Sequence, residues 1–126
     1  MRKIIILAAM LAMALVAAVP ALAVARSGGS GDDILYGTNG RDALSGGSGH
    51  DYMHGRGGAD ALSGGSGEDV LYGGSGRDAL SGGSGNDVIH DAFDGVKDTV
   101  YCGSGYDTAL VERVDVLYGC EEVLLD

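Results

Sequence analysis

The chain alternates short apolar segments with glycine-rich segments at a fixed interval of nine residues. From Gly28 to His90 it divides without gaps into seven nonapeptides: GGSGDDILY, GTNGRDALS, GGSGHDYMH, GRGGADALS, GGSGEDVLY, GGSGRDALS and GGSGNDVIH. Because side chains alternate between the two faces of a strand, positions 7 to 9 predict a three-residue strand whose middle side chain points inward. The predicted inward residues are Leu35, Leu44, Met53, Leu62, Leu71, Leu80 and Ile89.

Glycine occupies positions 1 and 4 of every copy, and positions 1 to 5 predict a tight turn that glycine tolerates best. Glycine and serine at this density are also typical of a flexible linker. A linker, however, does not keep one aspartate and one apolar residue in phase over seven copies. The fixed period therefore predicts a solenoid.

Odd-numbered and even-numbered copies differ in their strands. The odd copies read DILY, DYMH, DVLY and DVIH from position 6, whereas the even copies read DALS each time. The underlying period is therefore eighteen residues, which predicts that two copies make one turn and that alternate copies form two different sheets.

Position 6 is aspartate in all seven copies: Asp33, Asp42, Asp51, Asp60, Asp69, Asp78 and Asp87. Together with the glycines this forms the pattern GGxGxDxUx, which resembles the RTX (hemolysin-type) calcium-binding nonapeptide repeat over half of the chain. The resemblance implies an all-β fold, a right-handed parallel β-roll, with calcium held between stacked turns by the position-6 aspartates and turn carbonyls. The expected carbonyl groups include those of Gly29, Gly31, Gly47, Gly49, Gly65, Gly67, Gly83 and Gly85.

Stacked turns would bring the aspartates into register, where like charges repel unless a cation lies between them. Calcium accepts six to eight carboxylate and carbonyl oxygens, whereas zinc favours Cys and His, and magnesium retains its waters. Five sites are expected between the aspartates of alternate copies: Asp33/Asp51, Asp51/Asp69, Asp69/Asp87, Asp42/Asp60 and Asp60/Asp78. Two further pairs spaced by twenty residues, Asp78/Asp98 and Asp87/Asp107, bring the possible number to seven.

Residues 91–126 repeat the strand pattern less regularly, with rungs expected to start at Asp98, Asp107, Asp115 and Glu122. Solenoids need atypical ends, so this segment is interpreted as an irregular C-terminal cap. Cys102 and Cys120 lie eighteen residues apart, one full turn of the roll, and adjacent rungs are about 4.8 Å apart. A Cys102–Cys120 disulfide is therefore predicted in the cap.

The N-terminus predicts export. Arg2 and Lys3 precede an uncharged apolar segment and an A-x-A site, a pattern typical of a secretory signal peptide over residues 1–23. Cleavage after Ala25, or an uncleaved membrane anchor over residues 4–25, are the alternatives. Residues 24–27 are interpreted as a linker, residues 28–90 as the repeats. Without residues 1–23 the formal charge is −12, which disfavours nucleic acid and favours cations.

The sequence favours a secreted, non-catalytic calcium-binding protein without a membrane span after signal cleavage. It lacks HExxH, GxSxG and GxxxxGK[ST] motifs, and His50 and His54 do not have the helical setting that a zinc pair needs. The alternative is an extracellular adhesion module in which calcium is structural and an aromatic face binds a cell-surface glycan, a protein or a second copy. Its candidate residues are Tyr36, Tyr52, His54, Tyr72 and His90.

Overall fold

The computed structural model describes residues 22–91 and 93–125, which form twelve strands and no helix. The strands are β1 (Ala25–Ser30), β2 (Ile34–Tyr36), β3 (Ala43–Ser48), β4 (Tyr52–Gly57), β5 (Ala61–Ser66), β6 (Val70–Ser75), β7 (Ala79–Ser84), β8 (Val88–His90), β9 (Thr99–Ser104), β10 (Thr108–Val111), β11 (Val116–Tyr118) and β12 (Glu122–Leu125). None of the described residues belongs to a helix that could cross a membrane. The predicted signal peptide lies almost entirely outside the described residues.

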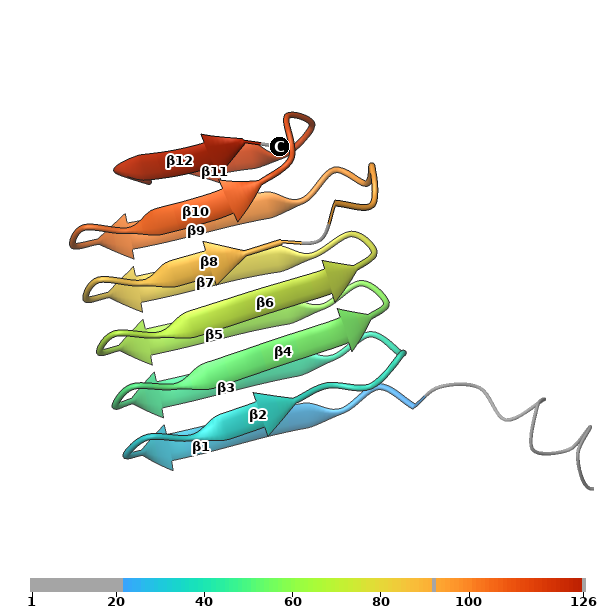
Figure 1. The fold of residues 1–126 in the computed structure, drawn as a ribbon. Coiled ribbons are helices and arrows are strands. Elements are labelled where there is room, and N and C mark those ends of the chain that lie inside the picture. The colour runs from blue at the N-terminus through green and yellow to red at the C-terminus, as the bar shows by residue number, and fades with distance from the viewer. Residues whose placement is uncertain (1–21, 92, 126) are drawn as a thin grey trace, which may run out of the picture.

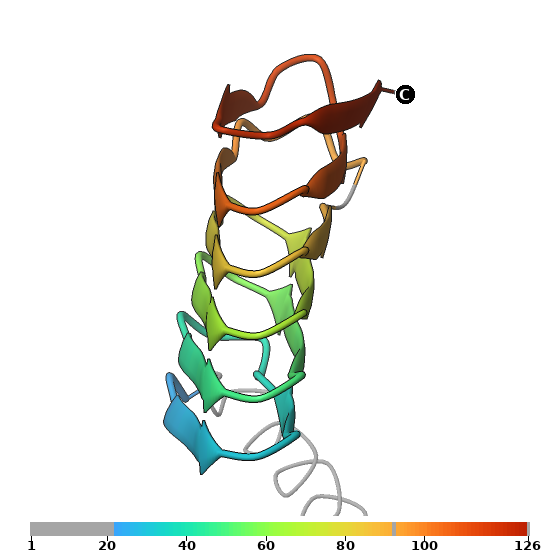
Figure 2. The ribbon, with the colours of Figure 1, turned by 90° about the vertical axis from the view of Figure 1, so that its left-hand side faces the viewer.

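The strands wind into six stacked coils, each contributing one strand to each of two parallel sheets (Figures 1 and 2). One sheet has the order β1-β3-β5-β7-β9-β11, and the other β2-β4-β6-β8-β10-β12. Residues eighteen apart pair in register, as Leu44 does with Leu62 in the first sheet and Met53 with Leu71 in the second. The predicted β-roll, with two nonapeptides per turn and alternate copies in different sheets, is confirmed.

The interior is a column of position-8 side chains from both sheets. Leu44, Met53, Leu62, Leu71, Leu80 and Ile89 are buried, while Leu35 at the N-terminal end is partly buried. Val100 and Ala109 continue the column in the last coils. The inward direction that the alternation predicted for position 8 is therefore confirmed along the repeats.

Most strands are twice as long as the pattern indicated, because positions 1 to 3 of the next copy also pair. Gly47 pairs with Gly65, and Ser48 with Ser66, so the first half of the predicted turn belongs to the sheet. This is possible because the position-2 glycines have φ near +100°, as in Gly47 and Gly65 (φ 99° and 102°). The actual turn is confined to positions 4 and 5.

The N-terminal linker expected over residues 24–27 is corrected in part, because β1 begins at Ala25. Ala25 pairs with Ala43, and Arg26 pairs with Leu44. The segment before the first repeat therefore supplies the first strand of the roll. Parallel pairing requires only a neighbour in register, so a strand can form here without the repeat sequence.

Candidate metal centre

The position-6 aspartates form two columns along the roll, one at each turn between the sheets. We call Asp33, Asp51, Asp69, Asp87 and Asp107 the odd ladder, and Asp42, Asp60, Asp78 and Asp98 the even ladder. Within each ladder the amide of one aspartate donates to Oδ1 of the next, at 2.6 to 2.9 Å. The Asp78/Asp98 and Asp87/Asp107 pairs share this geometry, although their sequence spacing is twenty.

The other carboxylate oxygen, Oδ2, is buried and has no hydrogen-bond partner along most of both ladders. This applies to Asp33, Asp51, Asp60, Asp69, Asp78, Asp87, Asp98 and Asp107. A buried carboxylate oxygen without a partner is costly, because water no longer solvates it. A row of such oxygens is what a bound cation would satisfy.

The position-1 glycines leave a gap beside these oxygens. A Cβ built on Gly55 would lie 2.6 Å from Asp60 Oδ2 and 2.5 Å from the carbonyl oxygen of Gly73 in the next coil. On the other side of the roll, a Cβ on Gly82 would lie 2.5 Å from both Asp87 Oδ2 and the carbonyl oxygen of Cys102. The same carboxylate and carbonyl pair borders Gly28, Gly37, Gly46 and Gly64. Glycine at position 1 therefore keeps open a cradle with two converging oxygens.

The carbonyl groups that border these cradles belong to position 1, whereas the resemblance suggested ligands at positions 2 and 4. The position-2 and position-4 carbonyls, such as those of Gly47 and Gly49, lie against the equivalent glycines of the next coil, Gly65 and Gly67. The carbonyls beside Oδ2 belong to position 1 instead. The invariant glycine at position 1 was the sequence signal for this role, but it serves a turn equally well.

Two copies begin with GTNG (residues 37–40) and GRGG (residues 55–58) instead of GGSG, and their turns differ from each other. In GRGG, Arg56 adopts φ 80° and pairs with Gly74, so this turn keeps the geometry of the regular repeats. In GTNG, the Thr38 amide and hydroxyl donate to the Asp42 carboxylate. Burial raises the pKa of Asp42, but the bonds from Thr38 and Val24 outweigh it and the net shift is downward. Asp42 therefore lacks the bare oxygen of its neighbours.

Three buried aspartates of the two ladders have a raised pKa. Burial raises the pKa of Asp78 to about 7, and the carboxylates of Asp60 and Asp98 add to the rise. Burial likewise raises the pKa of Asp60 to about 6, with the charge of Asp42 contributing. Burial also raises the pKa of Asp87 in the odd ladder to about 6. These carboxylates are destabilised as anions unless a positive charge joins them.

Carboxylate and carbonyl oxygens are the ligands of hard cations such as calcium. Zinc would require nitrogen or sulfur ligands. His50 and His54 do not provide them: Nδ1 of His50 accepts from the Glu68 amide, and Nδ1 of His54 accepts from the Arg56 amide. In the part of the chain that the structure describes, the one cluster of three potential metal-binding side chains consists of aspartates.

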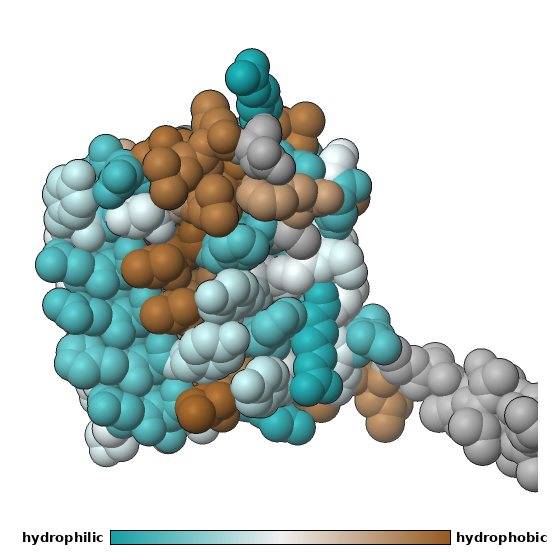
Figure 3. Space-filling view, viewed as in Figure 1, coloured by the Kyte–Doolittle hydropathy of each residue, from teal (hydrophilic) through white to brown (hydrophobic). Residues whose placement is uncertain are grey.

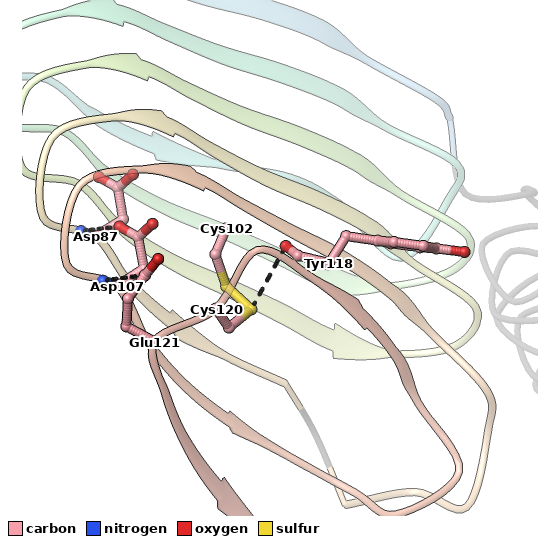
Figure 4. The surroundings of a disulfide bond; sticks show 6 residues. All are labelled: Asp87, Cys102, Asp107, Tyr118, Cys120 and Glu121. Atoms are coloured by element: carbon pink, nitrogen blue, oxygen red, sulfur yellow. Dashed lines mark hydrogen bonds between the residues drawn. A yellow bond between two sulfur atoms is a disulfide. The ribbon is translucent and has the colours of Figure 1, made fainter.

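The C-terminal coils continue the ladders with a change of register. Glu121, not Glu122, takes the position-6 place, because Thr108 pairs with Glu122 and the Asp107 amide donates to Glu121 Oε2 at 2.9 Å (Figure 4). The sequence assignment of Glu122 was therefore wrong by one residue. The shortened turn before it contains Gly119, and such a turn leaves no spacing pattern that fixes the register.

Cys102 and Cys120 form the predicted disulfide beside these carboxylates, with Cα atoms 5.0 Å apart (Figure 4). Cys102 follows Tyr101 in β9, and Cys120 follows β11, whose Tyr118 pairs with Tyr101. The bond therefore links two successive coils of the same sheet. Cys102 occupies the place of a position-1 glycine, and it is fully buried as part of the hydrophobic core.

The aromatic residues of the odd copies form a ladder on the outer face of the β2-to-β12 sheet, the face seen in Figure 3. Ring centroids are 5.4 Å apart for Tyr52 and Tyr72 and 5.1 Å apart for Tyr72 and His90. His54 stacks on Tyr72 at 5.7 Å, and the Arg56 guanidinium lies 5.2 Å from the centre of the Tyr36 ring. These contacts between rings partly shield the aromatic side chains from solvent, and Tyr52, His54, Tyr72 and His90 are half-buried.

The fold and the ladders define a class: a parallel β-roll whose turns present paired carboxylates and carbonyls to a cation. The family model of the RTX calcium-binding nonapeptide repeat (4 copies) matches residues 27–62 and again residues 54–89. These matches span half of the chain, and the chain belongs to this family. Calcium is therefore the ion that the roll of this family binds. A comparison with curated proteins found no match, and a comparison with solved structures found none either.

Proposed function

We propose that this chain is a secreted, non-catalytic protein whose folding is driven by calcium bound in the cradles of the two ladders. The observation that carries the proposal is the repeated bare Oδ2 beside a carbonyl oxygen of the next coil. Each cradle would take ligands from two coils, such as Asp60 Oδ2 and the Gly73 carbonyl. Calcium would then link successive coils while it neutralises buried carboxylates.

Secretion is supported by the signal-peptide pattern of residues 1–23 and by the disulfide. Disulfides form and persist in oxidising compartments, and the Cys102–Cys120 pair links the last coils. N-terminal sequencing of protein recovered from the medium tests the proposal, with Ala23 and Ala25 as the two expected cleavage sites. An intact Met1 on the recovered protein would contradict it.

A neutral substitution in the even ladder tests calcium binding directly. Asp60→Asn keeps the size of the side chain but removes one charged ligand between Asp42 and Asp78. We expect the calcium concentration at half-saturation, measured by isothermal titration calorimetry, to rise about tenfold or more, since even residues that only support a metal ligand change affinity by 10–100-fold.

The matched control is Asp32→Asn, one residue before Asp33. Asp32 is exposed at position 5, and its Oδ1 accepts from the His50 amide, a bond that an asparagine oxygen can also accept. This control should bind calcium as the unaltered chain does. Equal titrations for Asp60→Asn and the unaltered chain would show that the ladder does not bind the ion.

A second candidate function is adhesion through the aromatic ladder, with calcium as the structural ion. The continuous ring contacts from Tyr36 to His90 favour it, as do the exposed Ile34 and Val88 on the same face, 69% and 46% exposed. Aromatic surfaces of this kind suit contacts with sugars, with proteins or with a second copy.

Replacing Tyr36, Tyr52 and Tyr72 together by serine tests this candidate. The calcium-induced β signal in circular dichroism should persist, because these rings lie outside the core. Self-association in sedimentation, or binding to a glycan array in calcium, should be lost. If the unaltered chain and the variant behave identically in both assays, the ladder is a consequence of strand composition alone.

A further inference from the structure

Asp91 occupies a place that glycine holds in the earlier coils. Asp91 directly follows His90, the last residue of β8. In the preceding coil Tyr72 pairs with His90, and Gly73 follows Tyr72, so Asp91 is equivalent to Gly73. Asp91 is fully buried, and its amide donates to the Leu110 carbonyl at 3.0 Å. The chain therefore places a carboxylate inside the roll where the repeat pattern has no side chain at all.

This carboxylate replaces a carbonyl oxygen in the last glycine-bordered cradle of the even ladder. Beside Gly55, the cradle is bordered by Asp60 Oδ2 and the carbonyl oxygen of the next coil. Beside Gly73, a Cβ would lie 2.9 Å from Asp78 Oδ2, and still closer to Asp91 Oδ1 instead of a carbonyl. The cradle thus keeps its geometry of two converging oxygens but gains a negative charge.

Two more carboxylates complete the cluster. Asp91, Asp98 and Asp115 each offer an oxygen, and these atoms all lie within 4.8 Å of one another. The Asp98 amide donates to Asp115 Oδ1 at 3.0 Å, and the Glu112 amide donates to Asp115 Oδ2 at 2.8 Å, which fixes the orientation of Asp115. Two oxygens on one calcium ion can lie up to about 5 Å apart, twice the metal–oxygen distance, so this spread fits calcium.

Buried carboxylate oxygens without hydrogen-bond partners lie at this cluster. Asp78 and Asp98 are 2% and 1% exposed, and Oδ2 of each has no hydrogen-bond partner. Asp78 is not itself one of the three clustered residues, yet its Oδ2 faces the same gap as Asp91 Oδ1. A cation would satisfy these oxygens and relieve the repulsion between neighbouring carboxylates.

We propose that Asp91, Asp98 and Asp115, together with Asp78, form a calcium site of higher charge than the repeat cradles, which fills first when calcium is added. The site rests on the proposed function, because it extends the ladder that binds calcium. The number of charged ligands is one of the factors that set calcium affinity. It stands where the seven regular copies meet the less regular coils, and it links β8, the segment before β9 and the segment before β11.

Isothermal titration with calcium chloride tests the site in three chains. The unaltered chain should show one site that is about tenfold or more tighter than the remaining ones, as its extra carboxylate predicts. Asp91→Gly restores the residue that the repeat has at this place, and it should lose only the tight phase. The control is again Asp32→Asn, which alters an exposed aspartate of the first coil whose Oδ1 accepts from the His50 amide, and it should keep the tight phase.

The outcomes separate the site from the proposed function. No calcium binding by the unaltered chain would contradict the proposed function itself. Weak binding in all chains without a tight phase, or a tight phase that survives Asp91→Gly, would overturn the site while the function stands. If Asp91→Gly does not fold in calcium, Asp91→Asn keeps the shape and removes the charge, and a tight phase retained in that variant overturns the site.

Discussion

Removal of calcium at pH 7.5 is expected to unfold the roll. A chelator such as EGTA should abolish the β signal in far-ultraviolet circular dichroism and increase the hydrodynamic radius, and added calcium should restore both. The reason lies in the ladders: Asp60, Asp78 and Asp87 are buried, and each has an Oδ2 without a hydrogen-bond partner. Without a cation, these anions face one another in a poorly solvated interior.

Refolding should occur at calcium concentrations on the order of 10⁻⁴–10⁻³ M, the range of extracellular calcium modules, and with a steep dependence because each ion links two coils. Magnesium at the same concentration should not restore the fold, because it keeps its waters and prefers octahedral geometry. The idea fails if the calcium-free chain has the same β signal and the same radius as the calcium-loaded chain at pH 7.5.

Acid should substitute in part for calcium. The pKa values of Asp78 (about 7), Asp60 and Asp87 (about 6) are above that of an unfolded aspartate, so the folded state binds protons more tightly than the unfolded state. The calcium-free fold therefore gains stability as the pH falls from about 7 towards 4, and loses it as the pH rises through these values. Far-ultraviolet circular dichroism in EGTA at pH 5.0 and pH 7.5 measures the difference, and a β signal no larger at pH 5.0 than at pH 7.5 would contradict this explanation.

Gly65→Ala is expected to disrupt the roll, even with calcium present. Gly65 has φ 102°, and a Cβ there would collide with the carbonyl oxygen of Gly47 in the preceding coil. Because this carbonyl belongs to a paired strand, the collision can be relieved only if the two coils separate. Their separation would break the strand pairing of β3 with β5. We expect a loss of more than about 4 kcal/mol in the free energy of unfolding, a size that marks exceptional substitutions.

Gly29→Ala provides the matched control. Gly29 also occupies position 2 and has φ 99°, but it lies in the first coil and a Cβ there meets nothing within 4 Å. It should lose only the local backbone strain, on the order of 1–3 kcal/mol. Urea unfolding in saturating calcium compares the two variants. Equal losses would mean that backbone strain, not contact between coils, makes glycine necessary at this position.

Arg56 shows why the contact is the stronger constraint. It is the one residue other than glycine with positive φ among those described, and it also occupies position 2. In the coil before it, β2 ends at Tyr36 and Thr38 turns to bind Asp42, so β4 has no paired strand beside Arg56 on that side. A side chain is therefore accommodated at position 2 where the strand pairing with the preceding coil has already ended, at Tyr36 and His54.

The sequence by itself determined the coil, the two sheets, the inward residues and the pairs of aspartates. It could do so because a period of eighteen places every equivalent residue in the same environment, so that one repeat specifies all of them. The same argument located Cys102 and Cys120 in successive coils. From Gly28 to His90, where the period is unbroken, the arrangement of one turn therefore specifies the arrangement of the others.

The tertiary structure determined the contacts between coils and the features of the irregular segments, which the eighteen-residue period does not specify. Only the stacked coils show that a position-1 carbonyl, such as that of Gly73, faces the aspartate, because that contact joins residues of different coils. Thr38 satisfies Asp42 through a turn that the repeat does not predict. Asp91 keeps the spacing of a position-1 residue, but the insertion that follows it decides which carboxylates it meets. Glu121 follows a shortened turn, where sequence spacing no longer measures position in space. Their roles depend on how these loops close, which the neighbouring coils determine.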